Sequence, residues 1–174
     1  MTQRHLNTGI LFLAFCLTFA SGSARGQDDR PAWAAPPIDE VVSVRDGRTD
    51  EVLTFDAMLD VLSRAEAVFL GESHTDETTH QVEMAVYDGL LKRRNNQVVL
   101  AMEMFERDVQ KTLDLYLNGE IDETKFLKDS RPWGNYSTAY RPMIERAKSA
   151  GCTVIASNFP RPLRTRVSRE GVGV

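Results

Sequence analysis

Three apolar stretches of this sequence end in polar side chains that could do chemistry. They are Glu72 and His74 after residues 67–70, Glu103 after residues 97–102, and Asn158 after residues 153–156. If the three stretches are parallel strands, their carboxyl ends lie at one edge of a sheet, where open α/β sheets bind ligands. The sequence therefore predicts that two carboxylates, an imidazole and an amide converge on one site.

A divalent metal is one ligand that such a site could hold. Imidazole and carboxylate groups with open positions are common metal ligands, and the predicted ligands are Glu72, His74 and Glu103. His80 could join them from the start of the next helix, although its spacing from His74 is not the i, i+4 pair of zinc proteases. The alternative is that the two acids only accept hydrogen bonds from helix N-termini.

The elements that must position these residues alternate between strand and helix. Helices are predicted from a cap at Thr54 to Arg64, from Asp76 to Leu91, over residues 106–117, over residues 122–128, and from Pro142 to Gly151. Thr78-x-x-Gln81 has the form of a capping box, and Asp46-Gly47 suits the turn of a weak N-terminal hairpin. Strand–helix repetition predicts an α/β fold, a parallel sheet of βα units with helices on both faces.

The open edge of such a three-stranded sheet predicts a partner or a longer chain. Because the sequence stops at Val174, about where another helix should begin, we expect an incomplete, C-terminally short version of the fold. The Asp76–Leu91 helix also has a second apolar stripe that contains His80 and Tyr87. A later part of the fold, a ligand or a partner subunit could cover that stripe.

Composition and the N-terminal segment restrict the classes of function. The 174 residues are 42% hydrophobic and 26% charged, with net charge −4 and no basic block, so nucleic acid is not an expected partner. Residues 1–26 are typical of a signal peptide, which predicts export to the periplasm or cell envelope. Residues 27–37 are predicted to be a disordered tether and residues 38–174 the folded domain. Membrane association is expected only if Cys16 is lipidated, and the bulky Phe15 argues against that.

Several short motifs together resemble the ChaN-like haem-binding proteins of the Tiki superfamily, which also includes the erythromycin esterases. The resemblance extends from about Val42 to Arg161. The motifs are Gly71-Glu72-x-His74 with His80-Gln81, Ala101-Met102-Glu103-Met104-Phe105, Trp133 with Tyr136 and Tyr140-Arg141-Pro142, and residues 155–160.

This resemblance implies an exported bacterial protein, often a lipoprotein, that binds haem in iron uptake. It also implies a tyrosine ligand and a homodimer that encloses the cofactors; phenolate is a hard donor suited to ferric haem. The candidate ligands are Tyr87, Tyr136 and Tyr140, and His80 and Lys92 could meet the propionates. Members of the family are longer than this chain at the C-terminal end. The residues around Cys16 match a lipid-attachment motif only poorly.

Two further functions remain open beside haem binding. One is a metal-dependent hydrolase of the Tiki and erythromycin-esterase type, in which Glu72, His74 and Glu103 hold a metal or activate water. The other is an interaction domain in which these polar residues are structural. The sequence has no Gly-x-Ser-x-Gly elbow and no catalytic Cys/His pair, which disfavours covalent catalysis. Haem binding, without enzymatic activity, is the favoured hypothesis.

Overall fold

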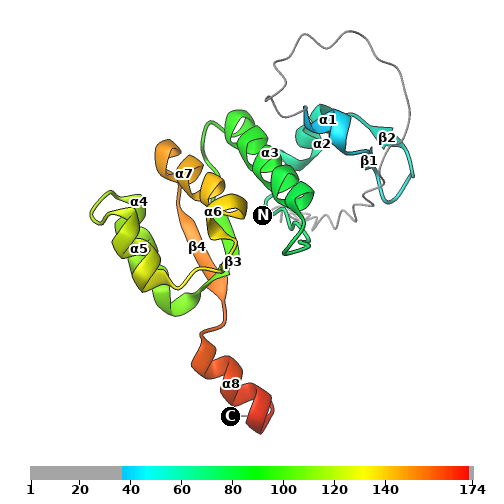
Figure 1. Cartoon of the computed structure of the whole chain (residues 1–174). Coiled ribbons are helices and arrows are strands. Elements are labelled where there is room, and N and C mark those ends of the chain that lie inside the picture. Colours follow the sequence, from blue (N-terminus) through cyan, green and yellow to red (C-terminus); the bar gives the residue numbers. More distant parts are fainter. Residues whose placement is uncertain (1–36, 173–174) are drawn as a thin grey trace, which may run out of the picture. The chain divides into compact units, whose positions relative to one another are not determined.

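The computed structural model describes residues 37–172, so the predicted signal peptide, Cys16 and nearly all of the predicted tether lie outside the described residues. The described residues divide into two compact units, one within Met1–Arg93 and the other within Arg94–Val174 (Figure 1). Within residues 37–172, no helix has the length and apolar character needed to cross a membrane.

The first unit contains a small hairpin and two principal helices. Its elements are α1 (Ile38–Val41), β1 (Val44–Arg45), β2 (Val52–Leu53), α2 (Phe55–Leu62) and α3 (Glu77–Arg93). The predicted hairpin is confirmed, since Val44 pairs with Leu53 in an antiparallel ladder. The Asp46 carboxylate accepts a hydrogen bond from the Arg48 N–H at 2.8 Å, which stabilises the turn between the strands.

Helices α2 and α3 pack together to form the core of the first unit. Thr54 caps α2 as predicted, because its hydroxyl accepts the Ala57 N–H at 3.1 Å. Gly89 allows the close approach of the two helices: a Cβ there would lie 2.5 Å from Leu59 Cδ1. At the end of α3, the Arg93 guanidinium donates to the Asp60 carboxylate at 2.8 Å. These contacts fix the face of α3 that points away from solvent.

The predicted strand at residues 67–70 is wrong. Residues 67–73 have no regular secondary structure, and no strand within residues 37–172 pairs with them. The Phe69 side chain is 69% exposed. An apolar composition favours a strand, but a strand also needs a neighbour for its N–H and C=O groups, and this segment has none.

The second unit is built around two parallel strands, β3 (Leu100–Glu106) and β4 (Val154–Asn158). Leu100 pairs with Val154 and Glu106 with Asn158, and the register shifts between Met102 and Glu106. The α/β class and the parallel pairing are therefore confirmed. The predicted end of the second strand is wrong, because the ladder continues to Glu106. Glu103 lies inside β3 with its side chain exposed, rather than after the strand's end.

The other elements of the second unit are helices that lie beside the strand pair, except that α8 extends away from it (Figure 1). They are η1 (Arg107–Val109), α4 (Gln110–Leu117), α5 (Glu123–Ser130), α6 (Tyr136–Ala139), α7 (Arg141–Ala150) and α8 (Arg161–Glu170). The predicted helices over residues 122–128 and from Pro142 are confirmed with small shifts, whereas the helix predicted over residues 106–117 is confirmed as an α-helix only from Gln110. Helix α6 lies in a segment for which no helix was predicted, and α8 begins at Arg161, earlier than the helix that was expected to begin near Val174.

One side chain covers part of the outer edge of β4. The Gln110 amide donates to the Val154 carbonyl at 2.8 Å and accepts the Ala156 N–H at 2.8 Å. A residue of a neighbouring strand would make the same pair of bonds. Helix α4 thereby satisfies backbone groups at an edge of the sheet that the sequence predicted to be open.

Candidate functional site

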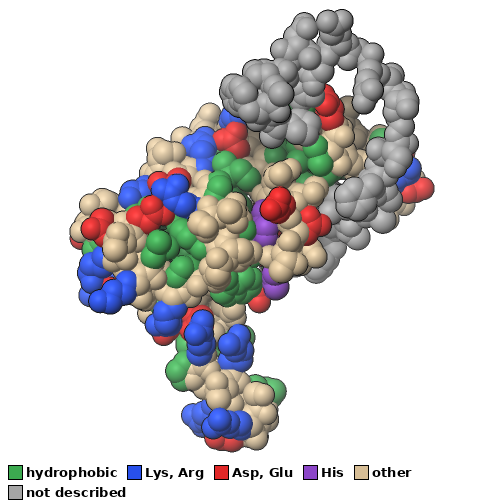
Figure 2. All heavy atoms as spheres, in the orientation of Figure 1, with side chains coloured by type: hydrophobic (Ala, Val, Ile, Leu, Met, Phe, Trp, Pro, Cys, Tyr) green, Lys and Arg blue, Asp and Glu red, His purple; other side chains and the backbone are tan. Residues whose placement is uncertain are grey.

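Four side chains with acid–base or ligand chemistry meet in the first unit: Glu72, His74, His80 and Glu83. The loop before α3 supplies the first two, and the first turns of α3 supply the others. Residues three apart on a helix lie on the same face, which explains why the second pair projects in one direction. Figure 2 shows histidine side chains in purple with acidic side chains beside them.

Asp76 sets the start of α3 and therefore the positions of His80 and Glu83. Its carboxylate accepts the Thr78 N–H at 2.7 Å and the Thr79 N–H at 3.4 Å. The Asp76 N–H donates to the Ser73 carbonyl at 2.9 Å, which closes the turn before the helix. The predicted cap at Thr78 is wrong, because Thr78 already lies within α3 and Asp76 is the residue that satisfies the free N–H groups.

The ring nitrogens of His80 connect the helix to the loop. His80 Nδ1 lies 3.0 Å from Glu83 Oε2 and 3.9 Å from Glu72 Oε1. His80 Nε2 lies 3.2 Å from the His74 carbonyl oxygen. His74 Nδ1 lies 3.0 Å from Glu72 Oε1. Glu72 is thus held between the two imidazoles.

The protonation of the cluster follows from these contacts. A carbonyl oxygen only accepts hydrogen bonds, so we assign a proton to His80 Nε2, which donates to the His74 carbonyl. His80 Nδ1 then faces the carboxylates of Glu72 and Glu83, and these also only accept when ionised. A proton or another cation must therefore lie between Nδ1 and the carboxylates.

The pKa shifts agree with this arrangement. Burial lowers the pKa of His80, but the hydrogen bonds to Glu83 and to the His74 carbonyl outweigh it, and the pKa lies above its usual value. Burial raises the pKa of Glu83, and the hydrogen bond to His80 offsets only part of that rise. Both shifts are upward, so the pair retains a proton to higher pH than a separate imidazole and carboxyl would.

The predicted metal set draws on both units. Glu72 and His74 are in contact within the first unit, and Glu103 belongs to β3 of the second unit. Among the described residues, the group that could hold a metal ion is Glu72, His80 and Glu83, whose ligand atoms all lie within 4.8 Å of one another. Glu83 was not among the residues predicted from the sequence. The signal for it is the His80-x-x-Glu83 spacing on one helix face.

The predicted haem ligands are buried side chains. Tyr87 is 4% exposed, Tyr136 is 3% exposed and Tyr140 is 2% exposed. The Tyr136 ring packs against Phe126, with the ring centroids 6.0 Å apart. The Tyr140 ring lies edge-on to Trp133 at 5.8 Å. A haem iron can reach these phenols only if the covering side chains move.

Tyr136 differs from an ordinary buried tyrosine in its hydroxyl group. Among the residues that the structure describes, this hydroxyl has no hydrogen-bond partner. Burial, followed by the negative charges of Glu123 and Glu145, raises the pKa of the Tyr136 phenol above its usual value. A buried hydroxyl without a partner costs free energy, so a new ligand would not cost Tyr136 an existing hydrogen bond.

Lys92, a predicted propionate partner, already has an acidic neighbour. Its Nζ lies 2.6 Å from Asp88 Oδ2 one turn earlier in α3, and its side chain is 70% exposed. An exposed pair of this kind contributes little to stability. Lys92 could therefore exchange Asp88 for a propionate at small cost.

A second charged cluster in the other unit anchors α8. The buried Glu106 carboxylate accepts the Arg161 N–H at 3.1 Å and Arg161 Nε at 2.6 Å, and it also accepts Arg131 Nη2 at 3.3 Å. Burial raises the pKa of Glu106, but the hydrogen bonds from Arg161 and Arg131 outweigh it and hold the pKa below its usual value. Both carboxylate oxygens of Glu106 have partners within the fold, so the cluster is structural.

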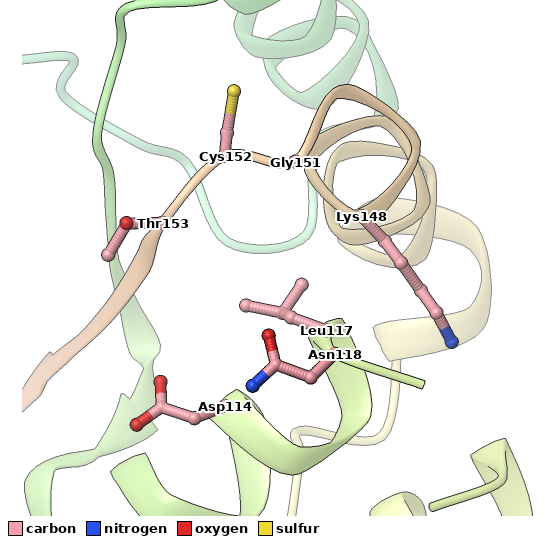
Figure 3. A pocket seen from close by; sticks show the side chains of 7 residues that line it. All are labelled: Asp114, Leu117, Asn118, Lys148, Gly151, Cys152 and Thr153. Carbon is pink, nitrogen blue, oxygen red and sulfur yellow. The ribbon is translucent and has the colours of Figure 1, made fainter. Parts of the chain in front are cut away.

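A hollow in the second unit has a volume of about 320 Å³ (Figure 3). Its lining combines α4, the end of α7 and the turn into β4, namely Asp114, Leu117, Asn118, Lys148, Gly151, Cys152 and Thr153. Small-molecule sites are mostly apolar with a few polar groups, and this lining is mainly polar. None of the predicted site residues lies in it.

Comparisons with known proteins relate the chain to one family. The sequence model described as "Haem-binding uptake, Tiki superfamily, ChaN" matches residues 58–174. The structure described as "Cofacial heme binding to ChaN of Campylobacter jejuni" is similar with a TM-score of 0.65 and 17% sequence identity. The match covers 76% of this chain and 54% of that one, so the chain spans about half the length of that relative. No curated protein sequence matches significantly.

Proposed function

The chain belongs to the haem-binding uptake family of the Tiki superfamily, and we propose that it binds haem. The match to the family over residues 58–174 is the observation that supports this proposal, and that range includes every residue predicted to contact haem. The likeness to the Campylobacter protein supports the fold. The proposed cofactor would contribute a ferric centre that accepts an oxygen ligand.

We propose Tyr136 as the iron ligand among the three candidate tyrosines. Its hydroxyl makes no hydrogen bond among the described residues, so ligation would not require an existing bond to break. Tyr136 lies in α6, a helix of only four residues, which can move at smaller cost than a long helix. Although burial favours the protonated phenol, a bound cation favours the phenolate.

A haemin titration of the chain from residue 27 onward tests this proposal. We expect a saturable change in the Soret band at near one haem per chain, with a phenolate-to-iron charge-transfer band. Tyr136→Phe should abolish the charge-transfer band and leave the fold intact, because the hydroxyl has no hydrogen-bond partner to lose.

Tyr116→Phe is the matched control. Tyr116 is also a buried tyrosine of the second unit, but its hydroxyl already donates to Glu145. The Tyr116→Phe variant should leave the haem spectrum unchanged. If Tyr136→Phe, Tyr87→Phe and Tyr140→Phe all retain the charge-transfer band, ligation by a tyrosine is refuted. If haemin gives no saturable spectral change, haem binding itself is refuted.

Export, a role in haem uptake and a homodimer are further parts of the proposal. They are supported by the signal-like residues 1–26 and by the family to which the chain belongs. Fractionation of expressing bacterial cells, with mass spectrometry of the N-terminus, tests export and lipidation at Cys16. A chain retained at full length in the cytoplasm would contradict export, and light scattering with and without haem tests the dimer.

A hydrolase is a second candidate because a carboxylate–imidazole pair is already formed. His74 Nδ1 lies 3.0 Å from Glu72 Oε1, and the His74 side chain is 52% exposed. An exposed imidazole oriented by a carboxylate could act as a general base toward water. Ester and peptide substrates test this hypothesis: His74→Ala should abolish any turnover, and no turnover by the unaltered chain with Zn²⁺ or Mn²⁺ would exclude it for these substrates.

A further inference from the structure

We infer that Glu72, His80 and Glu83 form a binding site for a divalent transition-metal ion in the first unit. One imidazole nitrogen and two carboxylate oxygens are ligands that Zn²⁺, Mn²⁺ and Fe²⁺ accept. The site goes beyond haem binding and does not depend on it, because no candidate tyrosine belongs to it. It also differs from the metal set predicted from the sequence, since Glu83 replaces Glu103 and His80 replaces His74.

The spacing of the three ligand atoms suits one ion. Metal–nitrogen and metal–oxygen bonds of about 2.1 Å place neighbouring ligand atoms about 3.0 Å apart at right angles and about 3.4 Å apart at a tetrahedral angle. His80 Nδ1 lies 3.0 Å from Glu83 Oε2 and 3.9 Å from Glu72 Oε1, and all three atoms lie within 4.8 Å of one another. Small rotations of the two carboxylates would complete the set.

The orientation of His80 gives a second and independent argument. A histidine that binds a metal usually donates its other ring N–H to a backbone carbonyl or a carboxylate, which fixes the tautomer. His80 Nε2 has such a partner in the His74 carbonyl at 3.2 Å. The nitrogen that remains, Nδ1, points at the two carboxylates, so a cation bound between them in place of a proton would receive its lone pair. That arrangement leaves a place for a cation.

The burial of the three ligand side chains favours a bound metal ion. The His80 side chain is 7% exposed, Glu83 is 11% exposed and Glu72 is 15% exposed. Burying two ionised carboxylates costs free energy unless a cation neutralises them. His74 Nδ1 holds the Glu72 carboxylate from the solvent side at 3.0 Å and is therefore a positioning residue. Three protein ligands would leave an open position for water.

Isothermal titration of the haem-free chain with Zn²⁺ and with Mn²⁺ tests this inference, alongside thermal unfolding and Co²⁺ absorbance. We expect one saturable site per chain, a raised melting temperature and visible Co²⁺ bands. Glu83→Gln should raise the Kd by more than about 100-fold, since even residues outside the ligand set cost 10–100-fold. His74→Ala changes a positioning residue and should raise the Kd for the metal roughly 10–100-fold.

Glu77→Gln is the matched control, because Glu77 is an exposed carboxylate on the same helix as Glu83. It should bind metal as the unaltered chain does. Glu72→Gln provides a second ligand variant if Glu83→Gln does not fold, since Glu72 lies in the loop before α3. Tyr136→Phe should keep metal binding whether or not haem binds, which separates this inference from the proposed function.

Two results would overturn the inference. One is the absence of saturable binding of Zn²⁺, Mn²⁺ and Co²⁺ by the folded chain, which would leave only a hydrogen-bonded cluster. The other is unchanged affinity in folded Glu83→Gln and Glu72→Gln variants, which would place the ion elsewhere.

Discussion

Replacing the residue that caps α3 should destabilise the helix that supplies His80 and Glu83. Asp76→Ala removes the acceptor of two N–H groups, those of Thr78 and Thr79. Loss of an N-cap costs about 1 kcal/mol, and loss of a carboxylate beside the positive end of the helix costs about 0.5 kcal/mol. The free energy of unfolding should therefore fall by roughly 1.5 kcal/mol.

Two companion variants separate the cap from the charge. Asp76→Asn keeps a capping oxygen and loses only the charge, so it should cost about 0.5 kcal/mol. Thr78→Ala tests the capping box predicted from the sequence. Because Thr78 lies inside α3 in the structure, its removal should change the free energy of unfolding by less than about 0.5 kcal/mol.

Urea unfolding followed by far-ultraviolet circular dichroism gives these differences, and hydrogen exchange at the Thr78 and Thr79 amides localises them. Asp76→Ala should lower the protection of both amides. It should also weaken metal binding, because the first turn positions His80. If Thr78→Ala costs as much as Asp76→Ala, or if Asp76→Ala leaves both amides protected, the account of how this helix begins is wrong.

Two further predictions concern the second unit. The pKa of Glu106 is lower in the folded chain than its usual value, so its stabilising effect is present above about pH 4.5 and is lost as the pH falls through the folded pKa. Glu106→Gln should therefore lower the free energy of unfolding at pH 7 by about 1 kcal/mol, since both arginine partners are partly exposed. The effect should become smaller as the pH falls below about 4.5, and an effect that stays equal from pH 7 to pH 3 would contradict this. Gly151 ends α7 at φ +66°, where an added Cβ is unfavourable, so Gly151→Ala should cost about 1 kcal/mol. Gly134→Ala, at a site with open space and no positive φ, is the control for thermal unfolding and should not destabilise.

Features that depend on a few neighbouring residues could be predicted from the sequence. The cap at Thr54, the helix that begins after Asp122 and the stop at Gly151 all agree with the structure. In each case the side chain or glycine acts on backbone groups within four residues. The α/β class and parallel pairing also followed from the strand–helix order, because topology rules restrict how such elements connect.

The candidate site could be predicted only in part. Glu72, His74 and His80 were identified from their types and spacing, and the structure places them in contact. Glu83 was missed because a glutamate on an amphipathic helix ordinarily faces solvent, whereas in the fold its side chain is only 11% exposed. The candidate tyrosines were identified, but their burial depends on side chains distant in the sequence, as the packing of Phe126 on Tyr136 illustrates.

The sequence by itself determined the local elements, the α/β class and the motifs that relate the chain to a haem-binding family. Tertiary structure decided where strands exist and which polar groups meet. Residues 67–70 have a strand-like composition but no strand to pair with, whereas Gln110, 46 residues before Ala156, supplies bonds that a strand would. The reason is that a hydrogen-bond ladder and a ligand cluster need groups that are near in space, and spacing along the chain does not determine that.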